Sequence, residues 1–205
     1  MRVGVLGGAF NPPHIGHLLL AQEALLQLNL DRVSFVPMGQ APHRVIDDDP
    51  GGEARLEMCE LATRDDERFS VSRIELDRRG PSYTSDTLRE LGEHAPGDEL
   101  VLLLDGDQAA ALPAWHEPEQ VLARAEVAVA ERTGFEREAV AAKVGGLAGA
   151  DDIRFFDMPR VDVSSSLVRR RAAGGVSVRY FVPEPVEAYI SRNGLYAASA
   201  AVGAE

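Results

Sequence analysis

The N-terminal stretch MRVGVLGGAFNPPHIGHLLL limits the possible folds more than any other part of the chain. It opens with a short Val- and Leu-rich run punctuated by glycine, which is typical of a buried parallel strand. From Gly16 onward the apolar residues recur at helical spacing, which indicates a helix. Pro12 and Pro13 stiffen the connection between the two. The stretch therefore predicts a strand, a rigid turn and a helix in direct succession.

The same alternation of strand-like and helix-like segments continues along the chain. It predicts an α/β fold: a Rossmann-like, doubly wound, mainly parallel sheet with helices on both faces. We expect one domain over residues 1–196, helical from about 164, and a frayed tail over 197–205. The later strands are expected at 32–39, 69–76, 99–107, 126–132 and 153–159, and the later helices at 53–65, within 77–94, at 118–125, 136–144, 164–175 and from 183 to Gly194.

In sheets of this kind, ligands bind at the edge where strands end and turns begin. The chemistry is therefore expected at the strand-to-helix turns.

Composition restricts the classes of ligand. The chain has 205 residues, 45% of them hydrophobic, which suffices for one core. The net charge of −12 argues against a general nucleic-acid or anionic-membrane surface, because such surfaces need spread positive charge. No apolar stretch reaches the roughly 18 residues of a membrane span. The single cysteine, Cys59, is expected in a helix core and in a reducing, cytoplasmic setting. An anionic ligand must then be held by a few local cations and by backbone N–H groups.

The turn after the first strand combines glycines with two histidines. Gly7 and Gly8 let the backbone approach a ligand, but the G-x-G-x-x-G spacing of a dinucleotide fingerprint is missing. His14 and His17 can share one face of the first helical turn. Three interpretations compete: a zinc site that lacks a third ligand, a pair bonded to neighbouring backbone, and a site where imidazole N–H groups hold phosphate oxygens. The glycines favour phosphate.

A second candidate anion site lies in the segment DVSSSLVRRR, near the end of the chain. Ser164, Ser165 and Ser166 begin a helix, so hydroxyls and unpaired N–H groups lie at one end. Arg169 follows on the same side of the first turn. These groups together can cradle an anion. The alternative is an ordinary capped helix with a solvated arginine run.

These two segments resemble the signatures of the nucleotidyltransferase superfamily. The stretch HIGH, from His14 to His17, is similar to its H-x-G-H motif, and residues 163–169 are similar to its I-S-S-T-x-x-R motif. The resemblance implies transfer of a nucleoside monophosphate from a nucleoside triphosphate without a covalent intermediate. It also implies that the two histidines stabilise the transition state at the α-phosphate and that the second segment holds the β- and γ-phosphates.

The middle of the chain narrows the resemblance. The segments PSYT…TL, DGD…PAW, VSSS…R and VPEPVEAYI…GLY follow an order similar to that in the bacterial nicotinate-nucleotide adenylyltransferase family, over roughly residues 2–196. That resemblance implies that ATP and nicotinate mononucleotide are joined to give deamido-NAD and pyrophosphate. For such a reaction we also expect Mg²⁺ bound through the ATP phosphates, where it would supply positive charge that this acidic chain lacks, with no metal ligand among the protein side chains.

The resemblance also assigns expected roles to single residues. The expected catalytic groups are His14, His17 and Arg169. The ATP side is expected to comprise Gly7, Gly8, Ala9, Phe10, His14, His17, Asp107, Ser164, Ser165, Ser166 and Arg169. The mononucleotide side is expected to comprise Asn11, His43, Arg44, Tyr83, Thr84, Ser85, Trp115 and His116.

Some of these assignments have plain alternatives. Trp115 is expected to stack on the pyridine ring, whereas a loop indole commonly plugs the core. His43 and Arg44 are expected to reach the mononucleotide phosphate from a loop, whereas both could simply be solvated. The acidic run DDDPGGE nearby fits no calcium loop and is interpreted as solvated.

Three positions depart from the family pattern. Asn11 stands where the family usually has Asp, and Arg44 replaces the usual Lys, which changes the geometry of the charge. Asp105 takes the place of a family Gly in G-x-D, where its side chain is expected to crowd the nucleotide or shift it.

Other functions compete with this expectation. A sister transferase would act on nicotinamide mononucleotide or phosphopantetheine, and hydrogen-bond donors at Thr84 and Ser85 favour the acid over the amide. A non-catalytic nucleotide sensor would explain the glycines and serines but not two histidines with a distant arginine. A dehydrogenase is disfavoured by the missing fingerprint. The sequence leaves the oligomeric state open, with a homo-oligomer among the options.

Overall fold

Six parallel strands form one open sheet in the order β3-β2-β1-β4-β5-β6. The computed structural model describes residues 1–42, 45–131 and 136–197. Each neighbouring pair of strands runs parallel, so all carboxyl ends meet at one edge. The strands are β1 (Arg2–Gly8), β2 (Arg32–Pro37), β3 (Phe69–Val71), β4 (Glu99–Asp105), β5 (Glu126–Glu131) and β6 (Arg154–Asp157).

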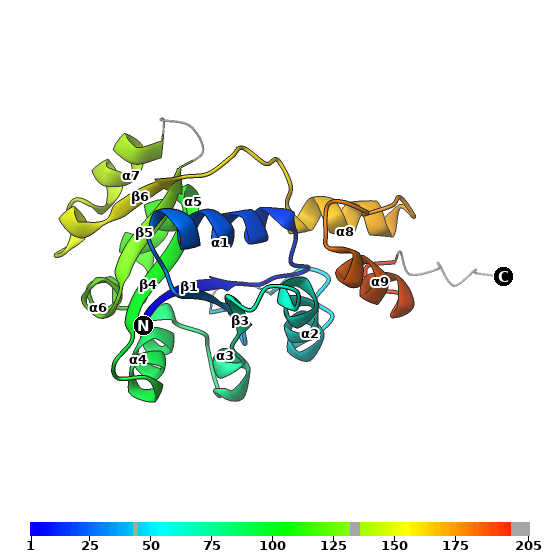
Figure 1. Cartoon of the computed structure of the whole chain (residues 1–205), viewed down its shortest axis with the longest axis horizontal. Helices are drawn as coiled ribbons and strands as arrows, with labels where there is room; N and C mark the ends of the chain where they lie inside the picture. Colours follow the sequence, from blue (N-terminus) through cyan, green and yellow to red (C-terminus); the bar gives the residue numbers. More distant parts are fainter. Residues whose placement is uncertain (43–44, 132–135, 198–205) are drawn as a thin grey trace.

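Helices cover both faces of this sheet (Figure 1). On one face of the sheet, helices α1 and α2 pack through an apolar cluster that includes Leu20 and Cys59. On the opposite face, the four helices α4, α5, α6 and α7 pack through a second cluster that includes Leu88 and Val121. The expected doubly wound α/β fold is confirmed. The helices are α1 (Ile15–Gln27), α2 (Gly52–Thr63), α3 (Ile74–Asp77), α4 (Thr84–His94), α5 (Gly106–Ala111), α6 (Pro118–Arg124), α7 (Glu136–Val144), α8 (Ser165–Ala173) and α9 (Glu184–Arg192), with short 3-10 turns at Leu112–Ala114 and Ala150–Asp152.

Two expectations about the apolar segments can be checked directly. Cys59 is fully buried on α2, as expected for a core residue, and burial raises the pKa of its thiol. Among the described residues, no helix combines the length and apolarity that crossing a bilayer would require.

The last two helices form a separate apolar cluster beside the sheet. Val168 of α8 and Val186 and Ile190 of α9 pack together with Met58 of α2. The main-chain N–H of Ile15, at the start of α1, donates to the Phe181 carbonyl at 3.0 Å. In Figure 1, α8 and α9 therefore lie beyond the carboxyl end of β1 rather than over a face of the sheet. This arrangement brings the end of the chain next to the first turn.

The expected strand over 69–76 is wrong in its second half. β3 ends at Val71, and α3 begins at Ile74. The Ser72 hydroxyl accepts the Ile74 N–H at 3.4 Å, a local bond that turns the backbone away from the sheet. Phe69 and Val71 pack on the α1 face, whereas Ile74 packs in the cluster on the opposite face.

The expected strand over 99–107 is also too long, because a helix starts inside it. β4 ends at Asp105, whose carboxylate accepts the Gln108 N–H at 2.8 Å, while the Gln108 side chain accepts the Asp105 N–H at 3.2 Å. This reciprocal cap starts α5, a helix that the sequence analysis missed. The Asp105 side chain therefore has a structural role of its own at this position.

Replacing Asp105 tests this role. Asp105→Ala removes the cap and is expected to lower the free energy of unfolding by about 1 kcal/mol, measured by urea denaturation. Asp107→Ala changes an exposed residue in the same turn and serves as the matched control. Equal, negligible effects of both substitutions would contradict the capping role.

Candidate active site

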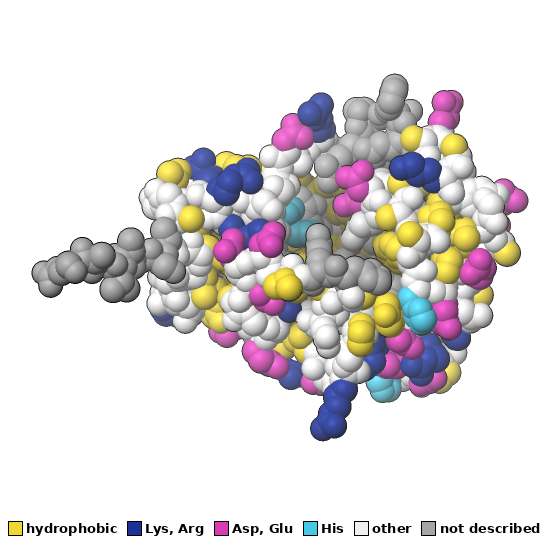
Figure 2. Space-filling view, turned by 180° about the vertical axis from the view of Figure 1, so that it is seen from behind, with side chains coloured by type: hydrophobic (Ala, Val, Ile, Leu, Met, Phe, Trp, Pro, Cys, Tyr) yellow, Lys and Arg dark blue, Asp and Glu magenta, His cyan; other side chains and the backbone are white. Residues whose placement is uncertain are grey.

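Two cavities lie side by side at the carboxyl end of β1. We call the first the histidine cavity; it measures about 380 Å³ and contains His14 and His17 in its wall. We call the second the tryptophan cavity; it measures about 230 Å³ and is lined by Trp115. Gly7, Gly8 and Gln108 line both. A Cβ placed on Gly7 would meet no atom within 4 Å, so this backbone opens onto free space. Figure 2 shows the hollow in this face, with histidine side chains in its wall.

The histidine cavity brings together most of the residues expected on the ATP side. Gly7 to Phe10 come from β1 and its turn, the two histidines from the start of α1, and the serines from the start of α8. Asp107 is not among them, because it is exposed and lines neither cavity. The residues expected on the ATP side that lie in this lining are Gly7, Gly8, Ala9, Phe10, His14, His17, Ser164, Ser165, Ser166 and Arg169. Asn11, expected on the mononucleotide side, also lies here and not in the tryptophan cavity.

The two imidazoles stack on each other, with ring centroids 3.8 Å apart and an interplanar angle of 27°. His17 Nδ1 accepts the main-chain N–H of His14 at 3.1 Å, which leaves the ring proton on Nε2. A Cβ on Gly16 would approach His14 Nδ1 to 3.0 Å, so a larger residue would press on that ring. The motif therefore fixes the tautomer of His17, and the glycine at position 16 leaves room for the ring of His14.

His17 is held as a neutral donor. Removal of its ring from water, together with the nearby His14, lowers the pKa of His17 well below its ordinary value. Phe10 packs edge-on against this ring, with centroids 4.9 Å apart, and is itself 1% exposed. At neutral pH, His17 thus offers an Nε2–H group without carrying a charge.

The start of α8 is joined directly to the first turn. The Ser165 hydroxyl donates to the Pro12 carbonyl at 2.9 Å, and Ser164 caps the helix by accepting the Leu167 N–H at 3.2 Å. Arg169 Nη1 donates to the Asn11 carbonyl at 3.0 Å, and its Nε lies 3.3 Å from the Asp48 carboxylate. The two segments quoted from opposite ends of the sequence therefore converge on one cavity.

Asn11 is buried at this junction, and protein groups engage both ends of its side chain. Its Oδ1 accepts the Tyr196 hydroxyl at 2.7 Å, and its Nδ2 donates to the Asp47 carbonyl at 2.7 Å. A carboxylate at this position could not donate the second bond. The departure from Asp is therefore explained by a neighbouring segment of the same chain. Within the acidic run, Asp48 and Asp49 are ion-paired, with Arg169 and Arg55 respectively, rather than simply solvated.

The tryptophan cavity contains four of the residues expected on the mononucleotide side: Tyr83, Thr84, Trp115 and His116. The Tyr83 and His116 rings lie 4.2 Å apart. Trp115 is half-buried and packs against the core while it lines this cavity, and its stacking on the pyridine ring stays a prediction. Ser85 is buried and lines neither cavity. His43 and Arg44 lie outside the described residues.

Glu75 is a buried carboxyl group in the tryptophan cavity that sequence reasoning missed. It accepts the Thr87 hydroxyl at 2.8 Å, and burial raises its pKa against the opposing effect of hydrogen bonds from Thr87 and Ser82. Gly39 leaves room for the Glu75 main chain, because a Cβ at Gly39 would collide with the Glu75 carbonyl oxygen. Glu75 thus links the end of β2 to the start of α4.

Arg55 is the other residue that sequence reasoning missed. It is 1% exposed, and its Nη1 donates to the Ala9 carbonyl at 3.0 Å and to the Met38 carbonyl at 2.7 Å. Its Nε lies 2.8 Å from the Asp49 carboxylate. Arg55 therefore ties the turn after β1 and the end of β2 to the acidic segment. In the sequence it occupies an ordinary place in an apolar-periodic helix.

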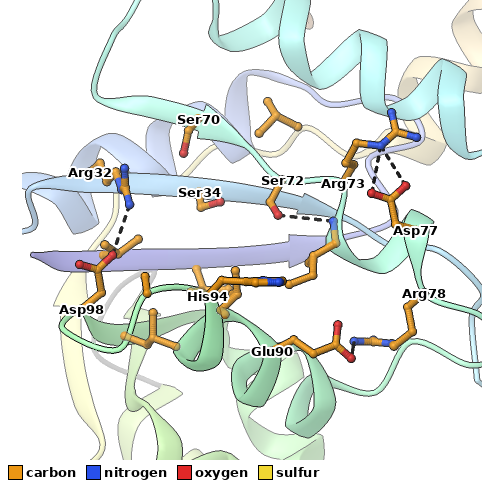
Figure 3. Close-up of a pocket in the computed structure, with 17 residues that line it drawn as sticks. Arg32, Ser34, Ser70, Ser72, Arg73, Asp77, Arg78, Glu90, His94 and Asp98 are labelled. Carbon is orange, nitrogen blue, oxygen red and sulfur yellow. Dashed lines mark hydrogen bonds and ion pairs between the residues drawn. The ribbon is translucent and has the colours of Figure 1, made fainter.

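The described residues hold no group of three or more His, Cys, Asp or Glu side chains that could bind a metal ion. A groove of about 650 Å³, larger than either cavity, lies between β2, β3 and α4 (Figure 3). Its arginines are all ion-paired: Arg32 with Asp98, Arg73 with Asp77 and Arg78 with Glu90. Each cation of this groove is therefore already neutralised by a carboxylate, and its described lining has no counterpart of the paired histidines and serine helix start of the histidine cavity.

Proteins of similar sequence indicate the family to which this chain belongs. The profile of the cytidylyltransferase-like family matches residues 5–171. A relative from Thermus thermophilus, named "probable nicotinate-nucleotide adenylyltransferase", is 44% identical over 96% of this chain and all of its own length. A relative of the same name from Shouchella clausii is 42% identical over 95% of this chain and 96% of its own length. The chain belongs to the nicotinate-nucleotide adenylyltransferase family.

Solved structures agree on the fold. Nicotinic acid mononucleotide adenylyltransferase of Plasmodium falciparum, complexed with NaAD, matches with a TM-score of 0.77 at 16% identity. The match covers 95% of this chain and 97% of that one. The shared fold therefore spans nearly the whole chain.

Arg55 offers a test of how the site is braced. Arg55→Met keeps the bulk but removes the buried charge and three hydrogen bonds, so the free energy of unfolding is expected to fall by about 3 kcal/mol, measured by urea denaturation. Arg64→Met, at the exposed end of the same helix, is the control and should change little. Equal stability of the two variants would contradict the bracing role.

Proposed function

We propose that this protein transfers the AMP part of ATP to nicotinate mononucleotide, forming deamido-NAD and releasing pyrophosphate. One observation carries the proposal: His14, His17, the start of α8 and Arg169 line one cavity that shares a glycine wall with an aromatic cavity. A triphosphate in the first cavity and a pyridine ring in the second would place the reacting phosphates at that wall. A cytoplasmic location belongs to the same proposal.

On the ATP side, the protein supplies fixed donors rather than a nucleophile. His17 would donate through Nε2–H, and His14 stacks against it, so both rings approach the α-phosphate from the start of α1. Arg169 and the serines at the start of α8 would hold the β- and γ-phosphates. Gln108 lines both cavities and is better placed than the exposed Asp107 to meet the nucleotide between them.

The reaction we propose is an in-line displacement. The 5′-phosphate of the acceptor attacks the α-phosphorus of ATP, the bond to the bridging oxygen breaks, and pyrophosphate leaves. A phosphate oxygen is already ionised near neutral pH, so the protein need only position the groups and stabilise charge. Mg²⁺ would enter on the ATP phosphates, where it neutralises charge, since the described side chains form no cluster to hold it.

On the acceptor side, the aromatic groups suit a flat ring that bears an acid. Trp115 and the Tyr83–His116 pair line the cavity with aromatic rings. Thr84 begins α4, so main-chain N–H groups at that end would receive the ring carboxylate. Ser85 would support this helix start from the buried side. Asn11 would contribute to mononucleotide binding from the neighbouring histidine cavity. His43 and Arg44 would reach the acceptor phosphate.

A coupled pyrophosphate assay tests the substrate assignment. With ATP and Mg²⁺, nicotinate mononucleotide should give at least roughly tenfold higher kcat/KM than nicotinamide mononucleotide, because only the acid offers a charge to the α4 amides. Phosphopantetheine should give no pyrophosphate. Higher turnover with the amide or with phosphopantetheine would replace the proposal with the sister activity, and no release with any acceptor would favour a nucleotide sensor.

His17→Ala tests the role of the imidazole pair. Loss of one donor aimed at developing charge is expected to lower kcat about 100-fold or more at saturating ATP. The KM for the mononucleotide should stay near its original value, because His17 lies outside the tryptophan cavity. His94→Ala, in the separate groove of Figure 3, is the matched control. Near-normal turnover of His17→Ala would refute this account of charge stabilisation.

A further inference from the structure

Tyr196 connects the C-terminal end of the described chain to the turn that carries the two histidines. Its hydroxyl donates to Asn11 Oδ1 at 2.7 Å, although the two residues are 185 positions apart. Asn11 is 2% exposed, so water has little access to this bond. The mechanism proposed above gives Tyr196 no role.

Asn11 transmits the contact to Arg169. Its side chain is held at both ends, by Tyr196 at Oδ1 and through the Nδ2 bond to the Asp47 carbonyl. Its main-chain oxygen accepts Arg169 Nη1 at 3.0 Å. A shift of Asn11 would therefore move the guanidinium that we assign to the β- and γ-phosphates. The other anchor of Arg169, Asp48, has a side chain that is 68% exposed.

The conformation of Tyr196 indicates that the surrounding structure holds it in place. Its φ of 62° lies in the left-handed region, which costs free energy for a residue with a side chain, so contacts of the surrounding structure must offset that cost. Leu195 and Tyr196 pack against the apolar cluster of α8 and α9. Burial raises the pKa of Tyr196, so the hydroxyl stays protonated and can donate at neutral pH.

We propose that Tyr196 is a positioning residue for the phosphate site: through Asn11 it holds the Arg169 guanidinium against the wall of the histidine cavity. The inference rests on the proposed function, because it takes Arg169 to be the group that binds the polyphosphate. Without the tyrosine hydroxyl, one end of Asn11 is released. Arg169 is then fixed chiefly by the exposed Asp48, on the acidic segment.

Tyr196→Phe removes one oxygen and keeps the packed ring. Binding of inorganic tripolyphosphate and of ATP to the full chain is measured by calorimetry without acceptor. We expect Kd for both to rise about three- to tenfold, as for the loss of one hydrogen bond. The KM for ATP should rise likewise.

Tyr189→Phe is the matched control, because Tyr189 of α9 is buried in the apolar cluster against which Tyr196 packs, and the group that raises the pKa of its hydroxyl beside burial is Glu57 rather than any part of the phosphate site. It should bind tripolyphosphate like the original protein, and both variants should have similar Tm values. In an Arg169→Ala background, Tyr196→Phe should add no further loss, since the route runs through that arginine.

The outcomes separate the two proposals. Unchanged tripolyphosphate binding by Tyr196→Phe, or an equal loss in the Arg169→Ala background, would overturn the positioning role alone. Absence of both tripolyphosphate binding and pyrophosphate release in the original protein would overturn the proposed function, and the inference with it.

Discussion

The two-sided pairing of β1 is the constraint on which the site depends. β1 bonds to β2 on one side and to β4 on the other. The helices that follow β1 and β2 cover one face of the sheet and those that follow β4 cover the opposite face, so a space opens beyond the end of β1. Gly7 and Gly8 form the wall between the two cavities at that end. A wall of bare backbone carries no side chain that would keep the two proposed substrates apart there. The histidines, α8 and the aromatic residues are all arranged around this short stretch.

The chain has a net charge of −12, so the proposed binding of a triphosphate depends on the few positive charges near this wall. Among the described residues, the two arginines beside the wall are already placed by protein oxygens. Arg55 is buried and held by two carbonyls and Asp49, so it braces the loops and stays away from the ligand. Arg169 keeps an exposed partner, Asp48, which a phosphate group can displace. The buried, fully paired Arg55 is therefore suited to bracing the loops, and Arg169, whose carboxylate partner is exposed, is suited to the binding role proposed for it.

The sequence predicts those parts of the fold whose stabilising contacts join residues a few positions apart. The strand–turn–helix at residues 1–27 and the capped start of α8 are local, and so is the chemistry predicted from them. Asp105 carried a readable signal as well, because Asp105 and Gln108 match a capping pattern that marks α5 inside an apolar run. The overlong strand at 69–76 had no such signal. The packing of Ile74 on the opposite face, together with its N–H bond to the Ser72 hydroxyl, shows why the strand ends early.

The supports of the site could not be predicted, because their partners are distant in the sequence and their residue types are ordinary. A motif describes groups that meet the ligand, whereas Arg55 and Tyr196 meet other protein groups. Asn11 shows the consequence most clearly. The family resemblance gives Asp at this position, so Asn11 reads in the sequence as the loss of a negative charge near the proposed phosphate site. In the structure its amide donates to the backbone of an acidic segment that a carboxylate would repel. The residue at 11 and the acidic run are therefore matched to each other, and a substitution at one should be judged with the other in view.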